Sequence, residues 1–359
     1  MTWPCSTRRR DSRAKNPSAA PLRWGVLLLS ALSILSLCAI AIATRGGRDA
    51  GVRVRGAGRT QDALFLRADN ATIPRIIHQS WKTPHAIPAR FQPWMRSWVA
   101  QHPTWTYVFW TDEDNLRLFE RLYPEYLAVA KAVGKISLAD MARYALLHSV
   151  GGLYVDADFE CKQPFDNLRE GAHRLILSSE PLAHTVLLEG SDEAALCNAL
   201  MASAPGHPFW LRVLDSIKAK FDAEGDHGDA VALTGPRIVK ETYFSPDFDF
   251  SDDDSDIAVF PQEYFYPEVA YWNLPSMQEA CEKRSDPPAE AACDWLSKFP
   301  HGEFTANTHA THHWQCTWCL GERSNDYVSL ADIFSGVAGV VARPDVTSTG
   351  IRFYSAFYR

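Results

Sequence analysis

The stretch GGLYVDADFE, residues 151–160, decides the predicted fold class. Two glycines precede a short apolar run, Leu153 to Val155, and Asp156 and Asp158 follow that run directly. The run is typical of a strand that is buried on both faces. Carboxylates at the end of a buried strand are costly unless a cation meets them, and where the chain turns both can converge on one ion. Hard oxygen ligands suit Mg²⁺ or Mn²⁺, which proteins commonly share with substrate phosphates, so the segment predicts an enzyme that holds a metal-bound diphosphate.

The spacing Asp-x-Asp is not specific by itself. It recurs three times in SPDFDFSDDDSD, residues 245–256, where no apolar strand comes before it. We expect that stretch to be a solvated loop. The alternative at Asp156 and Asp158 is a strand end whose aspartates cap the next turn.

Composition limits the class of protein. The chain has 359 residues, of which 46% are hydrophobic and 22% charged, which is typical of a globular protein with one large domain or two modest ones. Its formal net charge of −7 excludes a nucleic-acid binder by charge.

An uncharged run lies near the N-terminus, from Gly25 to Ala43, and as a helix it would span about 28 Å. We predict a signal anchor at residues 24–44; a cleaved signal peptide, with Ala41-Ile42-Ala43 as its site, is the alternative. Arginines flank the run on both sides, so the positive-inside count does not orient it. The glycosylation acceptor at Asn70 and six later cysteines favour an oxidising lumen for the body.

This orientation divides the chain into five parts. We expect residues 1–23 to be a cytosolic tail and residues 45–72, rich in Gly and Arg, to be a flexible luminal stem. A catalytic domain is predicted at 73–320 and a C-terminal extension at 321–359.

Strands and helices are predicted to alternate in the body. Strands are expected at 75–79, 105–110, 153–155, 174–178, 185–189 and 257–260, and helices at 89–100, 112–122, 125–133, 137–149 and 208–221. In the helix at 137–149, Ser137 is the expected cap, and Gly151 and Gly152 are expected to end it. The alternation predicts an α/β fold with a mostly parallel central sheet flanked by helices, whose ligands bind beyond the carboxyl ends of strands.

Four segments carry a resemblance to a known family: IPRIIHQSWKT (73–83), SLADMARYALLHSVGGLYVDADFE (137–160), TGP (234–236) and HHWQCTW (312–318). In this order they resemble the Golgi glycosyltransferases that include the fungal initiating α-1,6-mannosyltransferase and the inositol-phosphoceramide mannosyltransferases. The resemblance covers residues 73–318. It implies a GT-A nucleotide-sugar transferase fold, retention at the anomeric carbon, Mn²⁺ as cofactor, and a single-pass type II Golgi membrane protein with a luminal catalytic domain.

The family pattern assigns roles at the metal. Asp158 is expected to coordinate the ion, and Asp156 to contact the donor ribose or to reach the ion through water. His312 is the predicted third ligand, and His313 remains its alternative. Imidazole beside carboxylates favours Mn²⁺ over Mg²⁺, which stays open.

Further residues are predicted to lie around the donor. Asp140 and Arg143 are expected beside the donor sugar, the alternative being a helix cap with an i, i+3 ion pair. The resemblance places the nucleotide against the end of the first strand and lets backbone approach the donor at a glycine. The residues so assigned are His78, Gln79, Trp81 and Gly235. Acceptor contacts are predicted at Asn198, Trp314 and Trp318.

Six cysteines follow the anchor, and fifteen pairings are open to them. We expect Cys281 to pair with Cys293, and Cys161 and Cys197 to pair with the two cysteines at 316 and 319. A structural zinc site at Cys316 and its neighbours is the alternative.

Three functions compete at this stage. The first is a retaining transferase that moves mannose from GDP-mannose, or galactose or N-acetylglucosamine from a UDP-sugar, onto a glycan or glycolipid. The second is a glycoside hydrolase, which needs two carboxylates that flank a bond and no metal. The third is a sugar-binding protein without activity.

Overall fold

The computed structural model describes residues 63–64, 72–171, 173–246, 256–317, 321, 325–337 and 340–355. The chain divides into two units, Met1–Gly58 and Arg59–Arg359, and every described residue lies in the second. The predicted tail, the anchor at 24–44, most of the stem and Asn70 lie outside the described residues. Within them, no helix has both the length and the apolar character that a membrane crossing requires.

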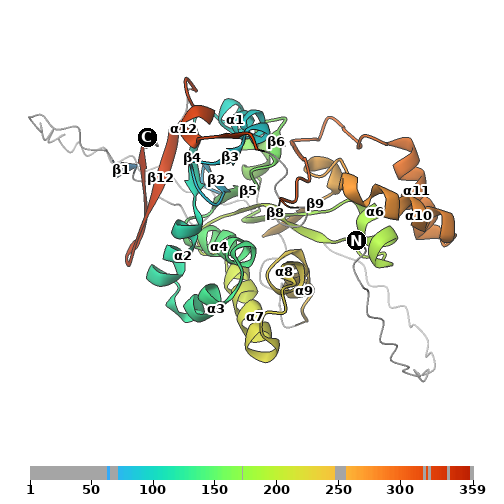
Figure 1. Ribbon diagram of the computed structural model, residues 1–359, viewed down its shortest axis with the longest axis horizontal. Coiled ribbons are helices and arrows are strands. Elements are labelled where there is room, and N and C mark those ends of the chain that lie inside the picture. The colour runs from blue at the N-terminus through green and yellow to red at the C-terminus, as the bar shows by residue number, and fades with distance from the viewer. Residues whose placement is uncertain are drawn as a thin grey trace, which may run out of the picture. The chain divides into compact units, whose positions relative to one another are not determined.

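One sheet of nine strands organises the described unit (Figure 1), in the order β1-β13-β12-β4-β2-β5-β8-β7-β9. In chain order its strands are β1 (Ala63–Leu64), β2 (Ile76–Ser80), β4 (Thr106–Trp110), β5 (Gly152–Val155), β7 (Leu175–Ser179), β8 (Leu196–Ser203), β9 (Ile257–Phe260), β12 (Val340–Thr347) and β13 (Gly350–Ser355). The neighbours β12, β4, β2 and β5 are parallel, as are β7 and β9. The strand β8 runs antiparallel to β5 and β7, so the sheet is mixed.

Helices cover both faces of the sheet, which confirms the predicted α/β class. In Figure 1 one face carries α2 (Asp112–Arg121), α3 (Leu127–Ala132), α4 (Lys135–Val150), α7 (Phe209–Glu224), α8 (Ala230–Leu233) and α9 (Pro236–Tyr243). The other face carries α1 (Gln92–Gln101) and α12 (Leu330–Ile333). Beyond β9 lie α6 (Leu182–His184), α10 (Leu274–Lys283) and α11 (Pro287–Lys298).

Shorter elements connect these layers. They are β3 (Ile87–Pro88), η1 (Ala89–Phe91), η2 (Pro124–Tyr126), β6 (Phe159–Cys161), α5 (Asp166–Arg169), η3 (Thr185–Glu189), η4 (Gln262–Tyr264), η5 (Tyr271–Asn273), β10 (Ala310–His312) and β11 (Tyr327–Val328). Two of them, β6 and β10, form a small antiparallel sheet of their own.

Each face of the sheet has its own hydrophobic core. Under α4 and α7, the rings of Tyr144 and Trp210 stack with centroids 5.8 Å apart. On the other face, α1 contributes Trp98, which donates a hydrogen bond to the carbonyl of Phe159 at 3.0 Å. Because both faces are covered, β4, β5 and β8 are buried along their whole length, and β5 carries the apolar run at 153–155 as predicted.

The helix α4 ends as predicted but begins differently. Gly134 occupies its N-cap, and Ser137 lies buried inside the first turn, so the capping role predicted for Ser137 is wrong. At the other end Gly151 adopts a φ of 64°. A Cβ at Gly151 would lie 2.5 Å from the carbonyl oxygen of Ser203 in the neighbouring strand β8, so this position requires glycine.

The strand predicted at 185–189 is wrong, because that segment forms the π-helical turn η3. Val186 and Leu187 pack against α10 and α11 through Met277 and Ala289. Both edges of β7, the strand that precedes this segment, are already paired, one with β8 and the other with β9.

Strands near the C-terminus complete the sheet. β12 is parallel to β4, with Val341 opposite Tyr107, and β13 returns antiparallel to β12. These residues fall in the segment predicted as an extension beyond 320. The sheet therefore takes strands from both sides of residue 320.

Candidate functional site: an acidic and histidine cluster in a cleft

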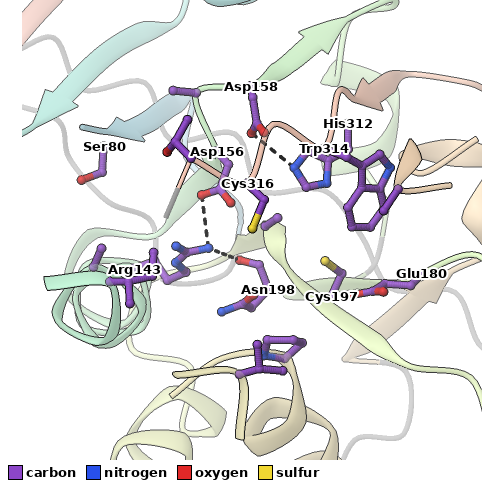
Figure 2. A pocket seen from close by; sticks show the side chains of 18 of the residues that line it. Ser80, Arg143, Asp156, Asp158, Glu180, Cys197, Asn198, His312, Trp314 and Cys316 are labelled. Atoms are coloured by element: carbon purple, nitrogen blue, oxygen red, sulfur yellow. Dashed lines mark hydrogen bonds and ion pairs between the residues drawn. The ribbon is translucent and has the colours of Figure 1, made fainter. Parts of the chain in front are cut away.

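The two aspartates follow the carboxyl end of β5, a strand in the middle of the sheet. The amide of Asp156 still donates to the carbonyl of Ala199 in β8 at 2.9 Å, and a tight turn follows, in which the Phe159 amide bonds to the Asp156 carbonyl at 3.2 Å. The chain then continues as β6. This turn brings the side chains of Asp156 and Asp158 to the same side, as Figure 2 shows.

Pairing of β6 with β10 delivers the third member of the cluster. His312 lies opposite Phe159 in that pairing, which places its ring beside Asp158 although 154 positions of sequence separate the two (312 − 158). Ligand atoms of Asp156, Asp158 and His312 all lie within 4.8 Å of one another. Three groups that can bind a metal, from two distant parts of the chain, thus meet at one point.

Asp158 is held by contacts on both oxygens. His312 Nε2 lies 3.2 Å from Oδ1, and the amide of Gln315 donates to Oδ2 at 2.8 Å. The residues on each side of Gln315, Trp314 and Cys316, have φ values of 48° and 33°, a conformation that costs non-glycine residues free energy. The strained loop therefore serves to aim one amide at Asp158.

The ring of His312 is fixed by aromatic packing. It stacks on Phe159 at 4.4 Å with an interplanar angle of 4°, and Trp314 lies 4.2 Å away. Its Nδ1 atom is buried and has no hydrogen-bond partner among the described residues. The Nε2 atom of His312 faces Asp158, so two carboxylates and one imidazole nitrogen lie together in a set that fits a divalent cation.

The charges of the two aspartates are set differently. Burial opposes ionisation of Asp158, but His312 and the Gln315 amide outweigh it and hold the pKa of Asp158 below its usual value. Burial raises the pKa of Asp156, and the nearby Arg143 opposes that shift only in part.

Arg143 connects α4 to the cluster. Its Nη1 lies 3.2 Å from Asp156 Oδ1 and donates to the carbonyl of Asn198 at 2.8 Å (Figure 2), while Nη2 lies 3.1 Å from Asp140 Oδ1. The guanidinium also lies 4.5 Å above the ring of Tyr154. Because Arg143 is only 4% exposed, these contacts hold it in one orientation at the cleft wall.

Asp140 lies behind Arg143 and does not line the cleft. Oδ1 accepts from the Asn198 amide at 2.9 Å, and Oδ2 accepts from the Thr234 hydroxyl at 3.0 Å. Burial raises the pKa of Asp140 to about 6, against the opposing charge of Arg143. The alternative predicted for these two residues holds in part. The i, i+3 ion pair of Asp140 with Arg143 is present, whereas the helix cap is not, because α4 begins at Lys135 after Gly134.

The residues predicted to contact the nucleotide separate into two groups. His78 and Gln79 are fully buried and do not line the cleft: His78 bonds to the Gly151 carbonyl at 2.9 Å, and Gln79 donates to the Asp156 carbonyl at 3.0 Å. Trp81 lines the cleft, and its indole N–H donates to the Ala86 carbonyl at 2.9 Å.

Other predicted residues lie close by. Asn198 and Trp314 both line the cleft. Gly235 caps α9, and a Cβ there would lie 2.9 Å from the Val231 Cα, so close packing of α8 against α9 accounts for this glycine. Trp318 lies outside the described residues. His313 points elsewhere, since it bonds to Glu160 at 3.1 Å and stacks on the ring of Trp94.

The cysteines follow the prediction in part. Cys281 and Cys293 form a disulfide that joins α10 to α11. Cys161 and Cys197 are free, so their predicted pairing with the cysteines at 316 and 319 is wrong. Cys316 is itself in a disulfide.

The cleft around the cluster has a volume of about 570 Å³. Sequence analysis missed several of its lining residues, because no motif marks them and distant loops supply them. They are Ser80, Lys82, Asp112, Lys135, Glu180, His184, Leu188, Glu189, Cys197, Trp272 and Asn273. Glu180 follows β7 directly, so a polar residue at a strand end was the one available signal.

Comparison with known proteins finds a family match for one segment of the chain. Residues 88–174 match the family model described as "Glycosyltransferase sugar-binding region containing DXD motif". This range contains α4, β5, Asp156 and Asp158. The resemblance stated from the sequence is thus confirmed for this region.

Curated relatives are similar over the same part. The chain is 32% identical over 169 residues to inositol phosphoceramide mannosyltransferase 3 of Schizosaccharomyces pombe, which covers 46% of this chain and 44% of that protein. It is 31% identical over 158 residues to a mannosyl phosphorylinositol ceramide synthase of Saccharomyces cerevisiae, covering 44% and 38%. An initiation-specific alpha-1,6-mannosyltransferase of Candida albicans is 23% identical over 210 residues, covering 50% and 54%. The chain therefore spans about half the length, or less, of these relatives.

Among solved structures, mouse xyloside xylosyltransferase 1 superposes with a TM-score of 0.40 at 10% identity, covering 68% of this chain and 98% of that one.

Proposed function

We propose that this chain is a metal-dependent glycosyltransferase that moves a hexose from a nucleoside diphosphate sugar onto a hydroxyl of a glycan or glycolipid. The donor we propose is GDP-mannose, and the reaction retains the anomeric configuration. The proposed site of action is the Golgi lumen, with residues 24–44 as the anchor of a type II membrane protein. The choice of mannose rests on the fungal relatives, which include an inositol phosphoceramide mannosyltransferase and an initiation-specific alpha-1,6-mannosyltransferase.

One observation carries the proposal: Asp156, Asp158 and His312 converge in a cleft at the carboxyl end of β5, inside or beside the region that matches the sugar-binding family model. A bound divalent cation would neutralise charge on the leaving diphosphate as a Lewis acid. Asp158 and His312 are the ligands we propose, and Asp156 lies close enough to complete the set.

The cleft is suited to an anion beyond its metal ligands. Lys135, Ile136 and Ala139, from the first turns of the long helix α4, line it. A helix N-terminus carries unpaired N–H groups and a partial positive charge that favour phosphate. Arg143 adds a fixed cation, and Lys82 lines the same cleft. We place the diphosphate in the cleft beside the Arg143–Asp156 pair, against the first turns of α4.

In the proposed transfer, a bond forms between the acceptor oxygen and the anomeric carbon on the face from which the diphosphate leaves. The bond from that carbon to the phosphate oxygen breaks, and the acceptor proton passes to the departing diphosphate. The fixed positive charge of Arg143 stabilises the negative charge on the diphosphate, which is larger in the transition state than in the bound donor.

The donor screen tests this proposal. Full-length protein is incubated with GDP-mannose, UDP-galactose or UDP-N-acetylglucosamine, each with Mn²⁺, with Mg²⁺ and with EDTA, and nucleotide release is measured. We expect release from GDP-mannose that requires a divalent cation. Release from a UDP-sugar alone would replace the donor, release that survives EDTA would contradict the metal role, and sugar binding with no release under any condition would favour a sugar-binding protein.

A further inference from the structure

A second acidic group lines the cleft and takes no part in the metal cluster. Glu180 follows β7, and its side chain is 15% exposed. Figure 2 shows Arg143, Asn198, Cys197 and Glu180 along the wall of the cleft, with Arg143 and Glu180 at opposite ends. Asp156 and Asp158 lie towards the Arg143 end in this view.

The partner of Glu180 is a neutral donor and not a cation. His184 Nδ1 lies 2.9 Å from Glu180 Oε2, while His184 Nε2 accepts a hydrogen bond from the Ala270 amide at 3.1 Å. A ring that accepts at Nε2 must donate from Nδ1, which leaves His184 uncharged. Within the described residues, Glu180 forms no salt bridge with Lys or Arg.

This arrangement keeps Glu180 an anion. Burial opposes its ionisation, but the hydrogen bond and the electrostatic interaction with His184, together with the hydrogen bond from Cys197, outweigh burial and lower the pKa of Glu180. A carboxylate can accept about four hydrogen bonds, so Glu180 retains acceptor capacity towards the cleft.

Two tryptophans lie next to the pair. Trp314 packs its edge against His184, with ring centroids 4.9 Å apart, and Trp272 lies 6.4 Å from Trp314. Both tryptophans line the cleft. An ionised carboxylate beside aromatic faces is suited to a sugar or cyclitol ring, because the faces cover its C–H groups and the carboxylate accepts from its hydroxyls.

We infer that Glu180, oriented by His184 and flanked by Trp272 and Trp314, binds the hydroxyls of the acceptor, and that the acceptor ring at this position is an uncharged polyol. The inference rests on the proposed function and deepens it. Glu180 is assigned to the acceptor and not to the donor because it bonds to His184 and not to a residue of the metal cluster. His184 in turn contacts Trp314, and Trp314 contacts His312. An anion at this place would repel an acceptor ring that carries a phosphate or carboxylate.

The test compares the wild type with Glu180→Gln, which keeps the shape of the side chain and removes its charge. Two probes that differ only at carbon 6 serve as acceptors: methyl α-mannoside, which is neutral, and its 6-carboxylate, methyl α-mannuronate. Transfer to each probe, nucleotide release without acceptor, and equilibrium binding of each probe are measured. Glu193→Gln is the matched control, since Glu193 is an exposed carboxylate that pairs with Lys240 at 3.0 Å outside the cleft.

We expect Glu180→Gln to raise the KM for methyl α-mannoside about tenfold or more, as loss of a charge-assisted hydrogen bond does. Release without acceptor should change less than about twofold, and the preference for the neutral probe over methyl α-mannuronate should fall about tenfold. Equal loss of release and transfer, or no change in either, would overturn the inference. If the wild type releases no nucleotide, the proposed function fails, and equal binding of the two probes by the wild type and Glu180→Gln would then overturn this inference separately.

Discussion

Arg143 Nη1 lies 3.2 Å from Asp156 Oδ1 while Nη2 of the same guanidinium lies 3.1 Å from Asp140 Oδ1. The guanidinium of Arg143 thus bridges Asp156, which belongs to the cluster, and Asp140, which is buried one turn before Arg143 in α4. Asp140 has both oxygens in use and lies behind Arg143, so its place in the structure is that of a residue that orients Arg143.

This geometry predicts that lysine cannot replace arginine. In Arg143→Lys, a single ammonium group cannot reach Asp140, Asp156 and the Asn198 carbonyl together. We expect nucleotide release to fall about 100-fold, because a positioned charge at the leaving group is worth about 3 kcal/mol. Release is measured beside urea unfolding, which reports whether the variant folds.

Arg237→Lys is the control for that experiment. Arg237 is half exposed and pairs with Glu189 at 3.4 Å, a surface ion pair worth about 1 kcal/mol or less. Its release should stay within about twofold of the wild type. A full rate in Arg143→Lys would reject the proposed role of the guanidinium.

Local pattern accounts for the part of the site that was predicted from sequence. Asp156 and Asp158 were recognised because an apolar strand precedes them, and the strand does end at the cleft. Gly151 was recognised as a helix end, and its φ of 64° agrees. Both rest on short-range geometry that a single segment determines.

Long-range pairing accounts for the rest. His78 and Gln79 were expected to touch the nucleotide, yet both turn into the core, because sequence does not tell which face of a strand end opens to a cleft. Glu180 and Trp272 carry no motif, and they reach the cleft only because β7 and η5 lie beside β8 and the loop after β10. The strand predicted at 185–189 was wrong for the same reason: its apolar residues meet α10 and α11 and not a free sheet edge.

The metal site predicts opposite outcomes for two adjacent histidines. His312→Asn should weaken Mn²⁺ binding at least about tenfold, since it removes one ligand from the cluster. His313→Asn should leave binding within about twofold, because His313 bonds to Glu160 and stacks on Trp94. Mn²⁺ binding is followed by electron paramagnetic resonance of the free ion. Stronger loss in His313→Asn than in His312→Asn would exchange their assignments.

Stabilisation of the folded protein by bound ligand tests the same site independently. Mn²⁺ with GDP should stabilise the folded wild type, by about 2.7 kcal/mol at a concentration 100 times the dissociation constant. Asp158→Asn should lose this stabilisation, and EDTA should reverse it in the wild type. Thermal unfolding with GDP and with UDP measures the effect, and a shift in Asp158→Asn equal to that of the wild type would contradict coordination by Asp158.

The turn between α4 and β5 predicts a steric effect on stability. Gly151→Ala should lower the free energy of unfolding by about 3 kcal/mol or more, because its Cβ would lie 2.5 Å from the Ser203 carbonyl oxygen and 2.7 Å from the Pro205 nitrogen. Gly190→Ala is the matched control. Gly190 has a similar φ of 68° but open space around the position of a Cβ, so only the backbone cost of about 1 kcal/mol applies. Urea unfolding measures both variants, and equal losses would show that the close approach to β8 relaxes without cost.

Burial of His78 predicts how stability depends on pH. Burial lowers the pKa of His78 from 6.5 to about 4, although the bond to the Gly151 carbonyl opposes that shift. Between these values the unfolded chain binds a proton that the folded protein does not bind, so stability falls as pH falls from 6.5 towards 4. The contribution is fully present above pH 6.5 and amounts to about 3 kcal/mol over the whole window.

Urea unfolding of His78→Gln should show a lower stability at every pH but a smaller loss between pH 6.5 and 4 than the wild type. His85→Gln, at an exposed histidine, should keep the slope of the wild type. If His78→Gln kept that slope as well, His78 would be protonated in the folded protein, and the neutral ring between Gly151 and Trp110 would have to be abandoned.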